Sequence, residues 1–312
     1  MSALLLLVAL PGLYWPQDVA SAPALRQAGI ERLSVPPGSA EAWRGAGFSV
    51  TPMGPAELAA RATLAAPGIA GRVDRASATR SPWLTANGWR FLREKGRLYA
   101  YDLPAGKAAL AAAEAFAYGA DAVLKIDQAD LDALGRMLAF LSELPAADLP
   151  EVADLGVVDD GTPLTGEVMN LLVRRNLLFR VVDAPAPQWR LNIRLGTSEY
   201  PKEEAADPSA FALKVRRQLT DDQRSLRIFG SEVVIGRLTG DATRVRLHLL
   251  NYGGRETFGL RIRLRGRWAE GEAFVGGTGR APLQDHVIAD GATEFSLPAM
   301  GPYAVVDLFA VK

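Results

Sequence analysis

Aspartates follow short apolar runs at five places along the chain, and this spacing is the feature of the sequence with the most chemical meaning. The runs end at Val73-Asp74, Tyr101-Asp102, Ile126-Asp127, Val158-Asp159-Asp160 and Val182-Asp183. In β/α folds the carboxyl ends of the strands build the active-site face, so carboxylates placed there can converge on a ligand. An aspartate between a strand and a helix can also cap the helix by accepting hydrogen bonds from its first free amides, and that role is the alternative at each position.

Carboxylates are the groups left for acid–base chemistry in the first two thirds of the chain. There is no cysteine, and the only histidines are His248 and His286, towards the C-terminal end. A Ser-His-Asp triad or a histidine metal site therefore cannot be assembled in the first two thirds. The sequence also lacks a nucleophile elbow, a phosphate-binding loop and a dinucleotide fingerprint. We expect neither a cofactor nor a metal.

Paired carboxylates are sufficient for glycoside hydrolysis, in which one acid protonates the leaving oxygen and the other acts as nucleophile or base. The candidates for these catalytic roles are Asp102, Asp127, Asp159, Asp160 and Glu167. Asp159 and Asp160 are the sharpest local feature, because adjacent strand residues point to opposite sides. One of them can face a binding site while the other caps the next helix. Asp160-Gly161 is equally an ordinary turn dipeptide, and Glu167 follows a predicted helix start, where an acid favours a capping role.

An aromatic segment lies between the first two aspartates. Residues 81–91 read SPWLTANGWRF, with three aromatic side chains among turn-forming residues. Aromatic rings stack on the C–H faces of pyranose rings, while asparagine and arginine bind hydroxyls. The predicted substrate-binding residues are therefore Trp15, Trp83, Asn87, Trp89, Arg90 and Tyr101. The alternative is that the tryptophans pack against the end of the fold, as large apolar side chains usually do.

Apolar runs alternate with amphipathic stretches from residue 13 to about 200, which predicts alternating strands and helices. The expected strands are 13–15, 32–35, 48–51, 98–101, 122–126, 152–158 and 178–182, with another around Val73, and the expected helices are 18–28, 39–46, 105–118, 130–144, 165–175 and 208–219. Such alternation means parallel pairing with right-handed crossovers. About eight strands favour a compact (β/α)8 barrel over 13–222, and an open doubly wound sheet is the alternative.

The pattern changes after about Arg224, where short apolar runs are separated by Gly, Asn and Pro without helices between them. This change predicts an antiparallel β-sandwich domain over 223–312. The segment LNYGGRE at 250–256 predicts a hairpin. Alternate arginines predict one solvated face of these strands: Arg244, Arg246, Arg261, Arg263, Arg265 and Arg267.

The composition excludes some classes of partner. Thirty-five basic residues balance 35 acidic ones, so the electrostatic signature of a nucleic-acid binder is absent. The apolar run 4–10 is too short to span a bilayer, and we expect no membrane span elsewhere. Residues 1–22 are either a signal segment or a first strand, which predicts a periplasmic or secreted protein in the first case and a cytoplasmic one in the second. A strand edge of the β domain could support a homo-oligomer.

Four segments carry a resemblance to known proteins: GLYWPQ at 12–17, TANGWRF at 85–91, VVDDG at 157–161 and VRLHLLNYGG at 245–254. With a β/α region followed by an all-β tail, the chain resembles bacterial glycoside-hydrolase-like proteins that combine a small β/α barrel with a C-terminal β-sandwich. The resemblance implies a carbohydrate or glycoside ligand. Residues 155–185 also resemble the flavodoxin-like, amidotransferase-like domain of some β-galactosidases, although a chain without cysteine could not carry amidotransferase chemistry.

Three hypotheses about function follow. The first is a glycoside hydrolase whose strand-end carboxylates act as general acid and nucleophile or base. The second is a non-catalytic carbohydrate-binding or assembly protein on a degenerate hydrolase scaffold, and the third is another small-molecule enzyme, because a fold alone does not fix function. Two carboxyl groups close together in a cleft lined by Trp83 or Trp89 would favour the first hypothesis. Carboxylates that are scattered and bound to helix amides would favour the second.

Overall fold

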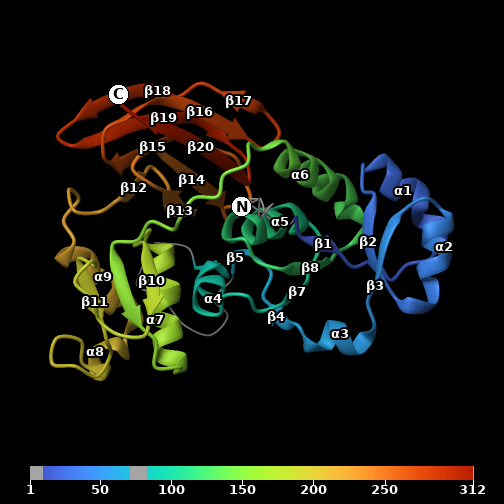
Figure 1. Cartoon of the computed structure of the whole chain (residues 1–312), viewed down its shortest axis with the longest axis horizontal. Coiled ribbons are helices and arrows are strands. Elements are labelled where there is room, and N and C mark those ends of the chain that lie inside the picture. Colours follow the sequence, from blue (N-terminus) through green and yellow to red (C-terminus); the bar gives the residue numbers. More distant parts are fainter. Residues whose placement is uncertain (1–9, 71–82, 312) are drawn as a thin grey trace, which may run out of the picture. The chain divides into compact units, whose positions relative to one another are not determined.

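The computed structural model describes residues 10–70 and 83–311, which belong to two compact units (Figure 1). The first unit comprises Met1–Gly68 and Glu94–Ala146, and the second comprises Ile69–Arg93 and Ala147–Lys312. The chain thus leaves the first unit, contributes a short segment to the second, and returns. This division follows contacts within the chain. The domain limits predicted from the sequence, 13–222 and 223–312, follow the change in element type instead, and they stay a prediction.

Short parallel strands build the first unit: β1 (Gly12–Leu13), β2 (Arg32–Val35), β3 (Ser49–Pro52), β4 (Ala62–Leu64), β7 (Tyr99–Asp102) and β8 (Ala122–Lys125). Strand β8 pairs with β1 and β7, and β7 also pairs with β4. Strand β2 pairs with β3, and a single bridge from Tyr14 to Ser34 links β1 to β2. The resulting order is β3-β2-β1-β8-β7-β4, with every pair parallel as the strand–helix alternation predicted.

Helices connect these strands: α1 (Ala22–Gln27), α2 (Ala40–Gly45), α3 (Pro55–Ala60), α5 (Ala108–Tyr118) and α6 (Leu131–Glu143). The alanine-rich α5 ends where predicted, because Gly119 adopts the left-handed conformation with φ of 63° and closes the helix. Helix α6 buries Leu131, Leu134 and Leu141 along one stripe, which is why the sequence pattern revealed it. Gly135 lies on this buried side, where α6 approaches the end of α1.

The expected eight-stranded barrel is not confirmed by the strand topology. Among the described residues no ladder joins β3 to β4, and the later strands of the α/β region form a separate three-stranded sheet in the second unit. Counting apolar runs gave approximately the right strands, but each run specifies only local conformation. Which strands share a sheet depends on contacts distant in sequence. The structure supports a mixed α/β region followed by a β-rich region.

The α/β part of the second unit is built on β9 (Leu155–Val158), which lies between β10 (Phe179–Val182) and β11 (Leu191–Ile193) in a parallel sheet. Its helices are α4 (Gly88–Arg93), α7 (Pro163–Arg174), α8 (Lys202–Ala205) and α9 (Pro208–Gln218). Helix α7 packs against both α4 and α9. Within the described ranges of both units, none of the helices has the length and apolar character needed to cross a membrane.

The C-terminal part of the second unit contains two antiparallel sheets that share one apolar core (Figure 1). One sheet has the order β12-β15-β19-β18, and the other has the order β13-β14-β20-β16-β17. The strands are β12 (Leu226–Phe229), β13 (Val234–Gly240), β14 (Arg244–Asn251), β15 (Thr257–Arg265), β16 (Trp268–Val275), β17 (Gly279–Ala281), β18 (Gln284–Ala289), β19 (Ala292–Met300) and β20 (Tyr303–Ala310). Leu247, Leu260, Phe295 and Val306 come from both sheets and are fully buried in the shared core.

The LNYGGRE segment is not a hairpin, so that prediction was wrong. It joins β14 to β15, and these strands belong to different sheets. Strand β14 already has β13 on one side and β20 on the other, which leaves no free edge for β15. The turn therefore carries the chain across the core. The Asn251 amide holds it by donating to the carbonyl oxygens of Arg255 and Gly301, at 2.7 and 3.2 Å.

The alternate arginines do not form a uniformly solvated face, which corrects a second prediction. Arg246 is buried and donates two hydrogen bonds to the carboxylate of Asp307, at 2.7 and 2.6 Å. Arg263 is also buried, with a 2.7 Å hydrogen bond to the Asp221 carbonyl oxygen. Arg261 is exposed as expected. Alternation predicted that residues share a face, but it did not reveal which parts of that face are covered.

Candidate functional site

The predicted catalytic carboxylates belong to different compact units. Asp102 ends β7 in the first unit, whereas Asp159, Asp160 and Glu167 lie on the β9–α7 connection and on α7 in the second. Asp127, in the first unit, accepts a 2.9 Å hydrogen bond from the Ala129 amide and caps a short 3-10 helix. The capping alternative is therefore confirmed at this position. Of the remaining strand-end aspartates, Asp183 is exposed after β10 and Asp74 lies outside the described residues.

Asp102 makes an ion pair at the surface of the first unit. Its Oδ2 lies 2.8 Å from Nζ of Lys125, its partner on β8, and its side chain is 70% exposed. Tyr101, the preceding residue, is buried and donates from its hydroxyl to Glu114 Oε2 at 2.7 Å. Trp15 is buried as well and donates from Nε1 to Ser21 Oγ at 2.9 Å. Among these three predicted site residues, only Asp102 is presented to solvent.

Asp159 forms a two-pronged ion pair with Arg93 in the second unit. Arg93 Nε lies 2.8 Å from one carboxylate oxygen and Nη2 lies 2.8 Å from the other. The Gly161 amide donates a third hydrogen bond to Asp159, and Arg93 also binds the carbonyl oxygen of Thr162. Both charged side chains are mostly buried, at 12% and 22% exposed. This arrangement clamps the end of α4 to the β9–α7 connection and occupies both carboxylate oxygens.

Asp160 is held as an ionised carboxylate at the start of α7. Its Oδ1 accepts hydrogen bonds from the hydroxyls of Thr162 and Thr165, at 2.7 and 2.6 Å, and from the Thr162 amide at 3.1 Å. Burial by itself raises the pKa of this carboxyl, but the threonine hydrogen bonds and the nearby Lys202 ammonium outweigh that effect and lower the pKa to about 2. At neutral pH the group therefore has no proton to give to a leaving oxygen.

Glu167 does not cap α7, contrary to the role that its position favoured. The cap is Thr162, whose side chain accepts a hydrogen bond from the Thr165 amide. Glu167 lies further inside the helix, half-buried, and accepts a 3.2 Å hydrogen bond from Nδ2 of Asn170. The helix start was predicted two residues late, and this shift explains the error.

The described part of the aromatic segment, from Trp83 to Phe91, is partly helical and packs on α7. Asn87 is buried at the start of α4, where its carbonyl oxygen accepts hydrogen bonds from the next turn. Trp89 lies against Gly166 of α7, where a methyl group added to the glycine would approach the indole to 2.9 Å. Arg90 is exposed, and its guanidinium lies 4.5 Å from the Trp89 ring centroid. Packing thus accounts for one face of Trp89, while the arginine covers part of the ring.

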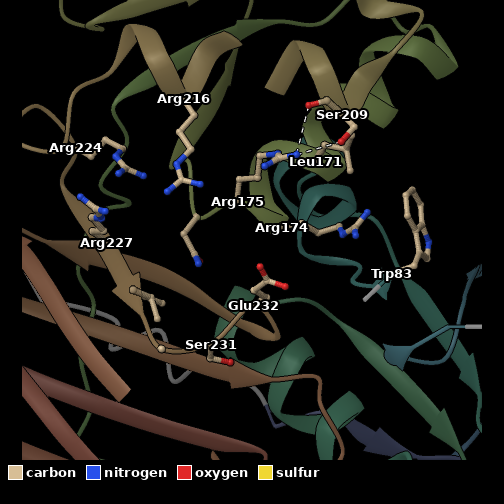
Figure 2. A pocket seen from close by; sticks show the side chains of 13 residues that line it. Trp83, Leu171, Arg174, Arg175, Ser209, Arg216, Arg224, Arg227, Ser231 and Glu232 are labelled. Carbon is tan, nitrogen blue, oxygen red and sulfur yellow. Dashed lines mark hydrogen bonds between the residues drawn. The ribbon is translucent and has the colours of Figure 1, made fainter. Parts of the chain in front are cut away.

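Trp83 lines a polar cavity of about 480 Å³ in the second unit, shown in Figure 2. The C-terminal end of α7, helix α9, strand β12 and the turn before β13 supply the rest of the lining. The lining residues are Trp83, Leu171, Arg174, Arg175, Asn176, Ser209, Arg216, Arg224, Arg227, Ile228, Gly230, Ser231 and Glu232. Arginines and hydroxyl groups dominate the surface, and Glu232 is the single carboxylate among these residues.

Asn176 fixes the geometry of this cavity. It follows α7 in the left-handed conformation, with φ of 55°, which asparagine tolerates better than most residues. Its Oδ1 accepts a 2.7 Å hydrogen bond from the Gly236 amide, and its Nδ2 donates to the Val234 carbonyl oxygen at 3.1 Å. The end of α7, with its two arginines, is therefore anchored to β13.

The pocket arginines were not among the residues selected from the sequence. Arg174-Arg175 and Arg216-Arg217 are double arginines at helix ends, where cations are favoured by the helix dipole. Because the helix dipole explains each pair, nothing in the sequence indicated that these arginines line one cavity. Their proximity depends on the packing of α7 against α9. Within the described ranges, no group of three or more His, Asp or Glu side chains is arranged to hold a metal ion.

Comparisons with known proteins show a likeness of fold. No protein-family profile matches the sequence, and no curated protein matches it significantly. Among solved structures, α-L-fucosidase isoenzyme 2 from Paenibacillus thiaminolyticus gives a TM-score of 0.52 with 9% identity, over 70% of this chain and 61% of the fucosidase. A rhamnosidase from Novosphingobium sp. PP1Y gives 0.45 with 13% identity, over 68% and 31% of the two chains.

A GH42 β-galactosidase from G. stearothermophilus gives a TM-score of 0.44 with 9% identity, over 72% of this chain and 55% of the galactosidase. This chain therefore spans less than two thirds of the length of each of these three enzymes. The likeness to the fucosidase has the highest TM-score of the three, and at such low identity it concerns the fold alone. The architecture of this chain resembles that of glycoside hydrolases, as its sequence predicted.

Proposed function

We propose that the protein binds carbohydrate on a glycoside-hydrolase-like scaffold without using a catalytic acid pair. The observation that carries this proposal is the state of the predicted carboxylates. Asp159 is bound through both oxygens to Arg93, and Asp160 is ionised and held by two threonines. A glycosidase needs one carboxyl group that keeps its proton near neutral pH and a second that is free to act as nucleophile or base. Asp160 does not meet the first requirement, and Asp159, which is bound through both oxygens to Arg93, does not meet the second.

The aromatic segment supports carbohydrate as the ligand class. Trp83 lines the cavity, and Trp89 is half-exposed beside the planar guanidinium of Arg90. Flat rings next to multiple hydrogen-bond donors suit a sugar ring, whose faces are apolar and whose edges carry hydroxyls. The fucosidase-like fold is a further reason to test saccharides before other ligands.

The test measures binding and hydrolysis separately on the same panel of neutral and acidic oligosaccharides. Binding is followed by calorimetry for wild type, Trp83→Ala and Trp89→Ala, with Trp268→Ala as a tryptophan control, since Trp268 lies on β16 and does not line the cavity. We expect binding in wild type, a loss of at least ten-fold in affinity in Trp83→Ala or Trp89→Ala, as for other aromatic contacts, and no turnover. Failure of every saccharide to bind would refute the proposal.

Hydrolysis is compared between wild type, Asp160→Asn and Asp102→Asn to test the other function predicted from the sequence. Turnover of a glycoside that falls by orders of magnitude in a folded variant would establish carboxylate catalysis and replace the binding proposal with a hydrolase. Asp159→Asn and Glu167→Gln are measured as well, because Asp159 and Glu167 were also predicted as candidates for the catalytic acid pair.

A further inference from the structure

The cavity beside Trp83 gathers positive charge from separate parts of the second unit. Five of its thirteen lining residues are arginines, against one glutamate. Arg174 and Arg175 come from the end of α7, Arg216 from the last turn of α9, Arg224 from the segment before β12, and Arg227 from β12 itself. Figure 2 shows these side chains arranged around one opening, with Glu232 on the opposite side from Arg216.

Internal partners neutralise only part of this charge. Asp221 pairs with Arg224 and Arg227, and Arg227 also lies over the Phe229 ring at 4.2 Å. Arg175 donates to Ser209 Oγ at 3.1 Å and to the Ser209 carbonyl oxygen at 3.4 Å, which are neutral acceptors. Arg224 is only 3% exposed, and its Nε has no hydrogen-bond partner in the described chain. A buried guanidinium N–H without an acceptor is costly, so this atom could donate to a further partner. The Nε atoms of Arg180 and Arg244, outside the cavity, also have no acceptor among the described residues, so the atom supports the argument only together with the convergence of the arginines.

The electrostatics of the arginines point the same way. Burial lowers the pKa of Arg175, Arg216 and Arg224, and in each case a neighbouring guanidinium lowers it further. Glu232 opposes this shift at Arg175, and Asp154 opposes it at Arg224. Arginine nevertheless keeps its proton in proteins, so the cavity remains cationic. An anion in the cavity would relieve both the repulsion and the lost solvation.

We propose that this cavity is an oxyanion-binding site and, resting on the proposed function, that the oxyanion is the carboxylate or sulfate ester of an acidic saccharide. Guanidinium groups match both anions because their paired N–H donors form two parallel hydrogen bonds with two oxygens. The Ser209 and Ser231 hydroxyls supply contacts for the sugar itself, while the Arg174 guanidinium already lies 4.0 Å from the Trp83 ring centroid. The volume of about 480 Å³ lies within the usual range of ligand pockets, about 300–1,000 Å³.

A purely structural role does not account for the whole cluster. Cations at the ends of α7 and α9 favour the helix dipoles, which explains Arg174 and Arg216 individually. It does not explain why Arg224 and Arg227, which precede or belong to β12, face the same opening. The convergence, together with the unpaired Nε of Arg224, is what indicates a ligand.

Calorimetric titration of the full chain tests the proposal with four probes: tetragalacturonate, a chondroitin sulfate tetrasaccharide, neutral maltotetraose and inorganic sulfate. The variants are Arg216→Gln and Glu232→Gln, with Arg217→Gln as the matched control. Arg217 is adjacent to Arg216, and Arg217→Gln removes the same charge as Arg216→Gln, but Arg217 does not line the cavity. Both Arg216 and Glu232 are exposed enough for the variants to fold.

We expect an acidic tetrasaccharide to bind at least ten-fold more tightly than maltotetraose. Arg216→Gln should weaken this binding by about ten-fold or more, and Arg217→Gln should change it less than two-fold. Glu232→Gln should strengthen binding by about two- to ten-fold, since it removes the single carboxylate of the lining. Misfolding cannot produce that increase. The chondroitin probe carries uronate carboxylates as well as sulfate esters, so tighter binding of this probe than of tetragalacturonate would show that sulfate esters add to recognition.

The outcomes separate this proposal from the proposed function. If neutral and acidic saccharides bind equally and the three variants behave alike, carbohydrate binding stands and the oxyanion site is refuted. If inorganic sulfate binds in wild type and is lost in Arg216→Gln while no saccharide binds, the oxyanion site stands and the saccharide assignment is overturned. If no probe binds, both proposals fail.

Discussion

Asp159 and Asp102 were predicted from the sequence as equivalent catalytic candidates, but the structure predicts very different costs for replacing them. Asp159→Asn keeps the shape of the side chain and removes its charge, which leaves the mostly buried Arg93 without an anion. Charged hydrogen bonds contribute about 1.5–3 kcal/mol each, and breaking a partly buried ion pair approaches the upper end of this range. We therefore expect Asp159→Asn to lower the free energy of unfolding by about 2–3 kcal/mol.

Asp102→Asn is the control, because its ion pair with Lys125 is largely exposed, at 70% and 45% for the two side chains. Exposed pairs contribute about 0–1 kcal/mol, so this variant should unfold almost like wild type. Urea unfolding followed by far-UV circular dichroism measures the free energy of unfolding of both variants. Equal stability of the two variants, or a more stable Asp159→Asn, would refute the structural role of the Arg93 clamp.

Three further predictions concern single sites. Gly135→Ala should destabilise the first unit by about 1–3 kcal/mol in urea unfolding, because the added methyl would meet the Ala28 carbonyl oxygen at 1.8 Å. Gly45→Ala in α2 is the control, and it should be neutral or slightly stabilising because there is open space around Gly45. A change of the same sign in both variants would contradict the packing of α6 on α1. Thr165→Val should raise the pKa of Asp160 from about 2 towards 3.8 in a carboxyl-carbon NMR titration, and an unchanged pKa would exclude the Thr165 hydroxyl as the cause of the low value. In wild type, the stability that the ionised Asp160 contributes should be present above about pH 4 and be lost as the pH falls towards 2. Burial, with Arg237 and Arg246 nearby, holds the pKa of His248 well below 6.5, so this histidine is protonated in the unfolded chain before it is protonated in the folded one. The free energy of unfolding should therefore fall by up to about 1.4 kcal/mol per pH unit below pH 6.5. This slope should disappear in His248→Asn and persist in His286→Asn.

The elements that the sequence predicted well are those whose signals are local. The strand 32–35 and the end of α5 at Gly119 follow from β-branched and apolar residues and from a glycine stop, which act within a few residues. The separation of β9, β10 and β11 from the strands of the first unit depends on contacts across many residues. LNYGGRE is a second example. Its turn residues predict that the chain reverses direction, but they do not determine which strand β15 will pair with.

The candidate site shows the limit most clearly. Asp160 was predicted as a catalytic candidate, with an Asp-Gly turn before a helix as the alternative, and the structure places it just before α7, where it accepts hydrogen bonds from Thr162 and Thr165. The arginines of the cavity lie between residues 174 and 227, at the ends of two helices, in the segment before β12 and in β12, and each has an ordinary explanation in its own segment. Their convergence is a property of the tertiary packing, so no pattern within one segment could reveal it.

The charge of this cavity also bears on what the protein was selected to do. Bringing like charges together and burying them costs stability, and helix dipoles and Asp221 offset only part of that cost. Residues that reduce stability are usually retained at functional sites, where the unfavourable arrangement becomes favourable once a ligand is bound. Replacing Arg216 should therefore leave the unliganded protein as stable as wild type, or more stable, while it removes the response to an acidic saccharide. A structural arginine such as Arg93 should behave in the opposite way, because its partner is already present within the chain.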